Sequence, residues 1–214
     1  MFINKQIFLG LMAQFEDIVF PAGNEEQFEG YSKKLGISNL IFCYTLNNLP
    51  KYFAKNSDSK KLGLIAAPYD ILKAKSKQLP ILCNKNDRHI FEQHYNEKYP
   101  LIVFGLEGIY NKDSLHSRHS GLNHILCELA HKNNIILGFS LSQLLASNNH
   151  ARPYIIGRMM QNIRLARKYK VKIKLASFSH EPIQMRSYND MVSLGVILGM
   201  QPSESKRALA DIIY

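Results

Sequence analysis

The stretch that decides the fold is Arg152–Ser177, which reads RPYIIGRMMQNIRLARKYKVKIKLAS. In its first part, apolar residues recur every three or four positions and form one stripe, made of Ile155, Met159, Ile163 and Ala166 and widened by Ile156 and Met160. This spacing is typical of a helix that is buried on one side. We therefore predict a long helix that packs against a hydrophobic core along this stripe.

The opposite side of the same helix is polar and positively charged. Gln161, Arg164 and Lys168 fall on it, and Arg158 lies one step round. Such a face can contact a polyanion, but a basic run is also typical of an ordinary solvent-exposed surface. The stretch by itself leaves both interpretations open.

A strand follows this helix after a very short turn, because Val171, Ile173 and Leu175 alternate with Lys172 and Lys174. Alternation with a period of two is the pattern of a strand. Six further short apolar runs also predict strands: Phe15–Phe20, Asn39–Tyr44, Leu62–Ala67, Pro80–Cys83, Leu101–Leu106 and Ile135–Phe139. Further helices are predicted at Asn24–Leu35, Asp87–Tyr95, Leu122–Lys132, Leu141–Ala146, Tyr188–Leu198 and Ser203–Ile212, with a weak helix or loop reaching Ser59.

Seven strands that alternate with helices predict parallel pairing through right-handed crossovers. This number of units favours an α/β, TIM-barrel-like fold over an open sheet, in one domain that spans residues 1–214. Lys172 and Lys174 predict an incomplete barrel, because lysines commonly protect an exposed sheet edge. Asn24 is expected to cap its helix and Gly36 to end it.

The composition indicates a basic globular protein. The 214 residues contain 27 Lys and Arg against 17 Asp and Glu, a formal net charge of +10, which attracts nucleic acid or other anionic surfaces. Cys43, Cys83 and Cys127 sit among apolar neighbours without CxxC spacing and predict buried structural thiols. No apolar run is long enough for a membrane span, and Ile7–Ala13 lacks a convincing cleavage site. We expect a cytoplasmic protein that does not contact the membrane.

In a barrel, the loops that follow the strands carry the functional residues. Here the most informative residues lie in the loop Glu107–Gly121 and in the two residues after it, Leu122 and Asn123. Its segment DSLHSRHSGLN supports three hypotheses. Asp113 could bind a divalent metal with some of His116, His119 and His124. In a second hypothesis, Ser120 caps the next helix while Asp113 or Ser114 braces the turn. In the third, Arg118 and the helix start hold a phosphate.

The metal hypothesis has evidence against it, because the first strand offers no His-x-His and the next three end without a ligand histidine. The chain also lacks GxSxG, GxxxxGK[ST] and GxGxxG motifs. A second polar loop contains Glu181 and Arg186, where Arg186 either contacts a ligand or pairs locally with Asp190.

Four ordered segments resemble a known family. They are DSLHSRHSGLN, GFSLSQLL (Gly138–Leu145), RMMQNIRLARKYKV with LAS (Arg158–Val171 and Leu175–Ser177), and MRSYNDMVSLGVILGM (Met185–Met200). In this order they are similar to ribonuclease P protein component 3, the archaeal counterpart of the thirty-kilodalton subunit of eukaryotic ribonuclease P and ribonuclease MRP. The resemblance covers Leu101 to Ala208 and is weaker earlier, at Asp17–Pro21. Tyr188 replaces a proline of the family pattern.

The resemblance implies a barrel related to the polymerase-and-histidinol-phosphatase metallo-phosphoesterases, without their metal cluster. It implies a subunit that binds a catalytic RNA, which removes the 5′ leader of precursor tRNA. A small RNA-recognition-motif-like subunit and other holoenzyme proteins would be partners, with apolar surface left by an unclosed barrel as the docking site. No catalytic residue and no protein-bound cofactor are expected, since RNA would hold the Mg²⁺ ions.

The expected RNA-binding residues follow from this resemblance and from the charge pattern. Arg118 and Asn123 would contact phosphate or sugar, Arg158, Arg164 and Lys168 would form a helical stripe, and Arg186 is a further candidate. Two other functions remain as alternatives: a stand-alone metal-dependent phosphoesterase of the same barrel superfamily, and a protein scaffold whose charge only increases solubility.

Overall fold

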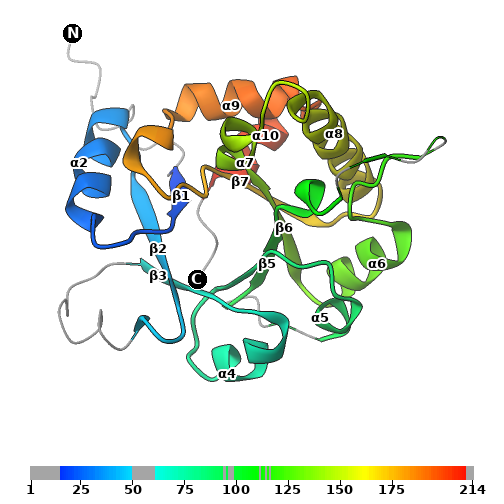
Figure 1. The fold of residues 1–214 in the computed structure, drawn as a ribbon, viewed down its shortest axis with the longest axis horizontal. Helices are drawn as coiled ribbons and strands as arrows, with labels where there is room; N and C mark the ends of the chain where they lie inside the picture. The colour runs from blue at the N-terminus through cyan, green and yellow to red at the C-terminus, as the bar shows by residue number, and fades with distance from the viewer. Residues whose placement is uncertain are drawn as a thin grey trace, which may run out of the picture.

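The computed structural model describes residues 15–49, 61–93, 95, 99–110, 112–113, 115 and 117–210. Seven strands pair in parallel and in chain order: β1 (Glu16–Val19), β2 (Asn39–Thr45), β3 (Lys61–Ile65), β4 (Ile81–Cys83), β5 (Leu101–Phe104), β6 (Ile135–Ser140) and β7 (Lys172–Ala176). Figure 1 shows that the strands surround a common centre. The predicted TIM-barrel-like α/β fold is therefore confirmed, with strand bounds within two residues of those expected.

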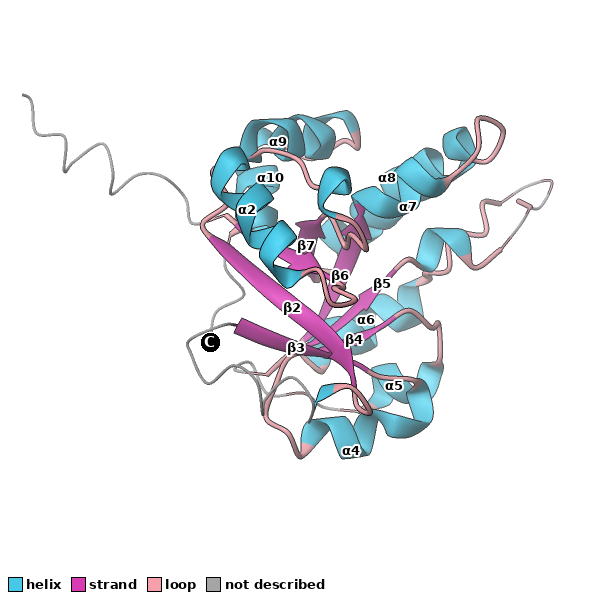
Figure 2. Ribbon diagram, turned by 60° about the vertical axis from the view of Figure 1, so that its left-hand side comes forward, coloured by secondary structure: helices cyan, strands magenta, loops and turns pink. Residues whose placement is uncertain are grey.

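Helices cover the outside of this barrel (Figures 1 and 2). The α-helices are α2 (Glu25–Leu35), α4 (Ile71–Lys75), α5 (Arg88–Glu92), α6 (His124–Lys132), α7 (Leu141–Ala146), α8 (Arg152–Lys168), α9 (Tyr188–Ile197) and α10 (Pro202–Leu209). Short 3₁₀ turns are η1 (Pro68–Asp70), η2 (Leu106–Gly108) and η3 (Pro182–Gln184). The expectations for Ile7–Ala13, for the segment up to Ser59, for Ser114 and His116 and for the end of the last helix lie outside the described residues. Within those residues, no helix is both long and apolar enough to cross a membrane.

The two end strands of the sheet come together, but a side chain supplies part of their pairing. The Asp17 carboxylate on β1 accepts a hydrogen bond of 2.6 Å from the amide of Ser177, just after β7. One step further on, the Phe20 amide donates to the Ser179 carbonyl at 2.8 Å. The barrel is therefore nearly closed, and Asp17 stands where a ladder hydrogen bond would otherwise be.

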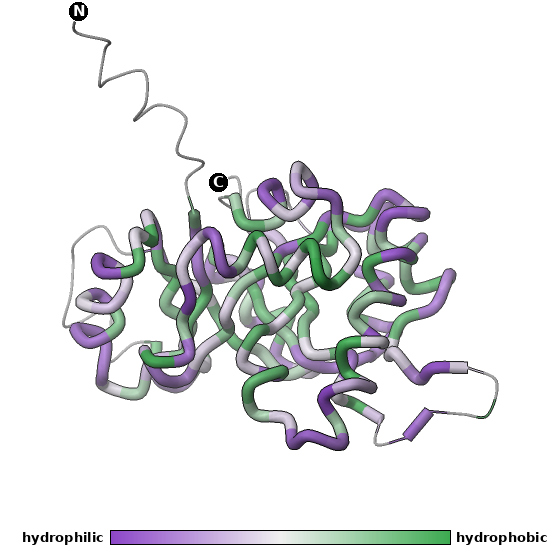
Figure 3. The backbone as a smooth tube through the Cα atoms, turned by 90° about the horizontal axis from the view of Figure 1, so that it is seen from above, coloured by the Kyte–Doolittle hydropathy of each residue, from purple (hydrophilic) through white to green (hydrophobic). Residues whose placement is uncertain are grey.

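Alternation along the strands separates two apolar layers. One set of side chains fills the barrel interior: Ile18, Phe20, Ile41, Cys43, Leu82, Ile102, Ile136, Ala176 and Phe178. The larger set lies between the strands and the outer helices. Figure 3 shows hydrophobic stretches in the middle of the molecule and hydrophilic stretches toward its periphery. All three cysteines are free and buried, as predicted.

Lys174 does not protect an exposed sheet edge, and this prediction is wrong. Its side chain is buried, donates to the Ala210 carbonyl at 2.8 Å and lies 3.7 Å from Glu16. Glu16 also pairs with Lys61 at 2.8 Å. The edge strands meet, and the segment around Ala210 lies against them, so the lysine has buried partners. Lys172 is exposed, as an edge lysine would be.

The ends of α2 follow the predicted positions but not all of the predicted contacts. Gly36 ends the helix in the left-handed conformation, with φ of 68°. Asn24 occupies the cap position, but its side chain accepts from the Ala22 amide instead of from a helix amide. The predicted side-chain cap is therefore wrong, because this asparagine stabilises the preceding turn.

Candidate nucleic-acid interface

The helix α8 packs as its sequence predicts along the apolar stripe. Ile155, Met159, Ile163 and Ala166 are buried, and Ile156 and Met160 are half-buried. Pro153 stands in the first turn, where its missing N–H is not needed, and Arg167 and Lys168 lie in the last turn, near the negative end of the helix dipole. The remaining sides of α8 face a loop and solvent, and they carry the candidate site.

Arg158 belongs to the buried part of this helix, so its predicted place in an exposed stripe is wrong. Only 2% of its surface is exposed. Its Nε donates to the Asp113 carboxylate at 2.8 Å, and its Nη1 donates to the carbonyls of Glu107 and Tyr110. The helical period placed Arg158 correctly beside the apolar stripe, but the loop that covers this position comes from a distant part of the sequence.

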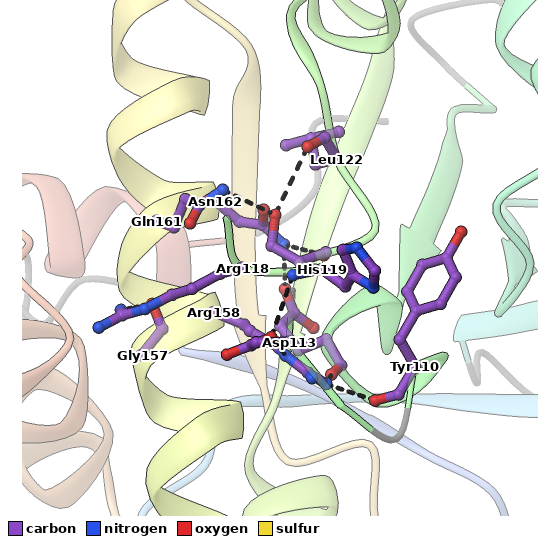
Figure 4. A network of polar contacts seen from close by, with 11 residues as sticks. Tyr110, Asp113, Arg118, His119, Leu122, Gly157, Arg158, Gln161 and Asn162 are labelled. Carbon is purple, nitrogen blue, oxygen red and sulfur yellow. Dashed lines mark hydrogen bonds and ion pairs between the residues drawn. The ribbon is translucent and has the colours of Figure 1, made fainter. Parts of the chain in front are cut away.

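Asn162, one turn further along α8, binds the same loop. Its Nδ2 donates to Glu107 Oε1 at 2.8 Å and to the Ser120 carbonyl at 2.9 Å. We call the residues Glu107, Asp113, Ser120, Arg158 and Asn162 the loop network. Figure 4 labels three of them, Asp113, Arg158 and Asn162, between the helix and the loop. The network fixes the loop after β5 against α8 at several points.

Two carboxylates of the loop network are affected in opposite directions. Burial raises the pKa of Glu107 to about 7, and the hydrogen bond from Asn162 and the charge of Arg158 offset this only in part. Burial also disfavours the charged form of Asp113, but hydrogen bonds from Arg158 and from the His119 amide hold the pKa of Asp113 below its usual value. The ion pair at Asp113 is thus stable at neutral pH, whereas Glu107 titrates there.

The loop itself is braced partly as predicted. Asp113 accepts from the His119 amide at 3.0 Å, which confirms its role in the turn. Ser120 is buried and does not cap α6; Asn123 is the cap, and its side chain accepts from the Leu126 amide at 2.9 Å. The side-chain oxygen of Asn123 thus stabilises the helix start, and its contact with an RNA backbone stays a prediction.

A groove of about 1340 Å³ runs along the solvent side of α8, beside the loop. Four cationic side chains line it: Arg118, Arg152, Arg164 and Lys168. Apolar atoms of Ile156 and Met160 also contribute to the groove. Arg164 and Lys168 are exposed, as the helical pattern predicts. The structure thus brings three of the predicted residues, Arg118, Arg164 and Lys168, into one cationic groove.

A glycine of α8 allows Arg118 to reach the groove. The Arg118 guanidinium donates to the Gly157 carbonyl at 2.7 Å (Figure 4). A Cβ at position 157 would lie 2.6 Å from Arg118 Nη1 and 2.9 Å from its Cζ. The guanidinium therefore lies across the helix where no side chain intervenes, and part of its charge remains exposed.

Arg186 lies outside this groove. Its Nη1 donates to the carbonyls of Ile183 and Met185, both at 2.8 Å. Asp190 instead accepts from Ser187 in the capping box that begins α9. The local brace at Arg186 is present, but the predicted pairing with Asp190 is wrong.

The residues of the metal hypothesis do not come together in the described part of the chain. Asp113 is engaged by Arg158 and the His119 amide, while the His119 ring lies against Tyr110, 5.2 Å between centroids. His124 is exposed in the first turn of α6. Across the described part of the chain, no three His, Cys, Asp or Glu side chains form a group that could hold a metal ion.

Several site residues were not found from the sequence. Arg152 lies in the groove and is held by hydrogen bonds to the carbonyls of Leu144 and Ser147. Glu107 and Asn162 face each other although 55 positions separate them. Only Gly157 left a signal, because a glycine in the middle of a helix is unfavourable and indicates close packing.

The fold and the site together define a class: a nearly closed parallel α/β barrel that carries a cationic groove on one outer helix. Residues 109–213 match the family model described as RNase P subunit p30. This match covers just under half of the chain and confirms the resemblance seen in the sequence.

Individual relatives agree with this assignment. The chain is 34% identical to ribonuclease P protein component 3 of Thermococcus kodakarensis over 89 residues, which cover 42% of this chain and 40% of the relative. The protein of the same name from Methanosarcina acetivorans is 32% identical over 95 residues, which cover 44% of this chain and 40% of the relative. The match thus spans about two fifths of the length of each relative.

A solved structure extends the likeness to nearly the whole barrel. A chain in the cryo-EM structure of archaeal ribonuclease P with mature tRNA superposes with a TM-score of 0.64 and 17% identity. The superposition covers 90% of this chain and 86% of that one. At this identity the likeness concerns the fold.

Proposed function

We propose that this chain is a protein subunit of ribonuclease P that binds and stabilises the catalytic RNA during removal of the 5′ leader of precursor tRNA. The observation that carries the proposal is the cationic groove on α8. Asp113, Arg118, Arg164 and Lys168 all lie in the segment that matches the family model, and the three cations face one open groove.

The groove suits the backbone of a folded RNA. Guanidinium groups donate in a planar fork that fits phosphate oxygens, and Lys168 adds a mobile point charge. Arg118 is pre-positioned by its bond to Gly157, so little of its freedom has to be lost on binding. Such contacts recognise shape and backbone instead of base sequence, as is usual for structured RNA.

In this proposal the chain performs no chemical step by itself. Mg²⁺ ions held by the RNA supply the catalysis, while the protein cations reduce repulsion between closely packed phosphates. A small RNA-recognition-motif-like subunit assembles with the chain in the cytoplasm, together with the other proteins of the holoenzyme.

The first experiment reverses the charge of the groove with the double substitution Arg164→Glu and Lys168→Glu. Arg158 is left intact, because its burial makes it unsuitable for charge reversal. We expect weaker binding to ribonuclease P RNA, and a slope of log K against log salt that falls in magnitude by about 2, close to one for each lost phosphate contact.

The matched control is Lys33→Glu with Lys34→Glu, in the last turn of α2, which changes the net charge by the same amount on another helix. Equal loss of affinity in both variants would show that only the overall charge matters. Unchanged affinity and salt slope in the groove variant would reject the RNA-binding role of α8 and favour a scaffold.

Reconstitution tests the assignment to ribonuclease P itself. The chain is added to the catalytic RNA, with and without the small partner subunit, and precursor-tRNA cleavage is followed at low Mg²⁺. We expect cleavage only when RNA is present and more cleavage when both proteins are added. Phosphodiester hydrolysis by the isolated chain would instead support the phosphoesterase alternative.

A further inference from the structure

A second hollow lies at the end of the barrel where the strands finish. This mouth pocket has a volume of about 440 Å³ and lies among Phe20 after β1, Asn84 after β4, Phe104 on β5, Ser140 on β6 and Phe178 after β7. In barrel proteins this end is where ligands bind. The volume is within the range of small-molecule sites.

Aromatic rings form one side of the mouth pocket. Phe104 and Phe178 stack with centroids 4.7 Å apart and planes 4° from parallel. Phe20 lies 5.7 Å from Phe104, and the exposed His180 ring lies 4.9 Å from Phe20. Phe178 and Phe20 are buried, while Phe104 remains partly exposed. A flat group entering the pocket therefore meets a ring system that is already ordered.

The polar groups around these rings are neutral. Amides of Asn84, Gln143 and Gln184 and the hydroxyl of Ser142 line the pocket. Gln143 donates to the Gly105 carbonyl at 3.3 Å, and its Oε1 is buried without a hydrogen-bond partner in the described part of the chain. Amides and hydroxyls of this kind can pair with the donors and acceptors on the edge of a nucleobase.

The charge of the lining residues indicates which kinds of ligand the pocket can bind. Among the described residues that line it, none is Asp, Glu, Lys or Arg, and His180 is the one titratable side chain. A phosphate would lack a countercharge there, and a divalent cation would lack carboxylate ligands. A neutral, planar group with hydrogen-bonding edges satisfies both the rings and the amides.

The mouth pocket is connected to the cationic groove through α7. Gln143 and Ala146 of α7 line the pocket, and Arg152 of the groove donates to the carbonyls of Leu144 and Ser147 at the end of the same helix. An RNA strand whose phosphates lie in the groove can therefore pass over α7 toward the pocket.

We propose that the mouth pocket binds one unpaired nucleobase of the RNA whose backbone lies in the α8 groove. The inference rests on the proposed RNA-binding function and adds a contact of a different kind. The base leaves the RNA stack and lies against the phenylalanine cluster, as unstacked bases commonly do on aromatic side chains. Its edge pairs with the amides and hydroxyls that line the pocket.

The test fills the pocket without removing core atoms. Ala146 is exposed and lines the pocket, whereas its neighbour Leu145 is exposed and does not line it. Ala146→Phe and Leu145→Phe therefore form a matched pair of variants of the full chain. The probes are short single-stranded oligoribonucleotides that carry one 2-aminopurine, and matched oligonucleotides with an abasic site at that position.

For the unmodified chain and for Leu145→Phe, we expect the abasic oligonucleotide to bind at least about fivefold more weakly than the 2-aminopurine oligonucleotide. About fivefold corresponds to the lower limit for stacking one base. For Ala146→Phe, both oligonucleotides should bind equally, and the fluorescence change of 2-aminopurine should be lost. Equal affinities of the two probes for the unmodified chain would overturn the proposal, as would unchanged discrimination by Ala146→Phe.

The groove variant separates this inference from the proposed function. Arg164→Glu with Lys168→Glu should weaken both oligonucleotides by the same factor and leave their ratio unchanged. In one outcome, the variant loses affinity with the expected salt dependence while the unmodified chain binds the 2-aminopurine and abasic oligonucleotides equally. That result would refute the pocket and leave the proposed function intact. If the groove variant keeps its full affinity and still prefers the oligonucleotide with the base, the groove is refuted and the pocket is retained.

Discussion

Two arginines on α8, six positions apart, differ in nearly every property that decides what a charge does. Arg158 is 2% exposed and holds Asp113 and two backbone carbonyls of the loop network. Arg164 is exposed in the groove, and no hydrogen bond or ion pair joins it to the described part of the chain. One arginine is engaged inside the protein, and the other is available to a ligand.

The difference follows from the cost of removing a charge from water. A buried guanidinium must keep its donors satisfied, so removing either partner of a buried pair is strongly destabilising. An exposed charge remains hydrated, and its contribution to folding is small. The loop network therefore determines where the loop lies, whereas the groove determines what can bind beside it.

The largest expected effect comes from Arg158→Ala. This change leaves the Asp113 carboxylate and the Glu107 and Tyr110 carbonyls without their donor, and we expect unfolding free energy to fall by about 3–5 kcal/mol. Arg164→Ala should change it by less than about 0.5 kcal/mol, as is usual for a surface residue. Chemical denaturation of both variants measures the contrast.

Part of the loss at Arg158 arises from packing of its aliphatic stem. Arg158→Met keeps much of that stem and removes the donors. It should therefore lower the unfolding free energy by less than Arg158→Ala does. Equal, small losses for Arg158→Ala and Arg164→Ala would contradict the distinction between the loop network and the groove.

The next effect concerns pH. Because burial raises the pKa of Glu107 from 4.5 to about 7, the folded state binds this proton more tightly than the unfolded chain does. Its contribution to stability is therefore present below about pH 4.5 and is lost as the pH rises to about 7. Glu107→Gln keeps an oxygen for Asn162 and cannot ionise, so it should be more stable than the unmodified chain at pH 8, by at most on the order of 3 kcal/mol.

The stability difference between Glu107→Gln and the unmodified chain should shrink toward zero at pH 4. A difference that is independent of pH would show that Glu107 does not titrate in this interval. Glu204→Gln is a control of opposite sign: burial opposes ionisation, but the hydrogen bond from Arg167 holds the pKa of Glu204 below its usual value. Removing that charge should therefore destabilise the chain at neutral pH.

The same contrast explains which features the sequence could predict. The strands, the apolar stripe of α8 and the exposure of Arg164 and Lys168 depend on local period, which is written in neighbouring residues. The burial of Arg158 depends on Asp113, 45 positions earlier, and the burial of Lys174 depends on Glu16 and on the segment around Ala210. Contacts at such separations have no local pattern.

Side-chain caps show a second limit. Ser120, Asn123 and Asn24 are all residue types that favour helix starts, and only Asn123 accepts from an amide of the helix that it precedes. The choice depends on how the preceding chain enters the helix. The polar groups of the mouth pocket come from the ends of several strands, so no local pattern joins them into one site.

The smallest expected change in stability is at Gly157, which lies beside Arg158 of the loop network and contacts Arg118 of the groove. In Gly157→Ala, the new Cβ occupies the place of the Arg118 guanidinium, whose Nη1 would be 2.6 Å away. Alanine favours the helix by up to about 1 kcal/mol relative to glycine, and loss of the bond to the Gly157 carbonyl offsets this gain. We therefore expect almost no net change in stability, measured by denaturation, together with weaker RNA binding because Arg118 is displaced.

The double substitution separates the gain from alanine in the helix from the loss of the hydrogen bond between Arg118 and the Gly157 carbonyl. In an Arg118→Ala background there is no guanidinium to displace, so Gly157→Ala should stabilise the chain by about 1 kcal/mol and should leave the remaining RNA affinity unchanged. If Gly157→Ala were equally stabilising with and without Arg118, the glycine would not be positioning the arginine. Arg118 would then line the groove without depending on Gly157, and close packing against α8 would not contribute to the position of this cation.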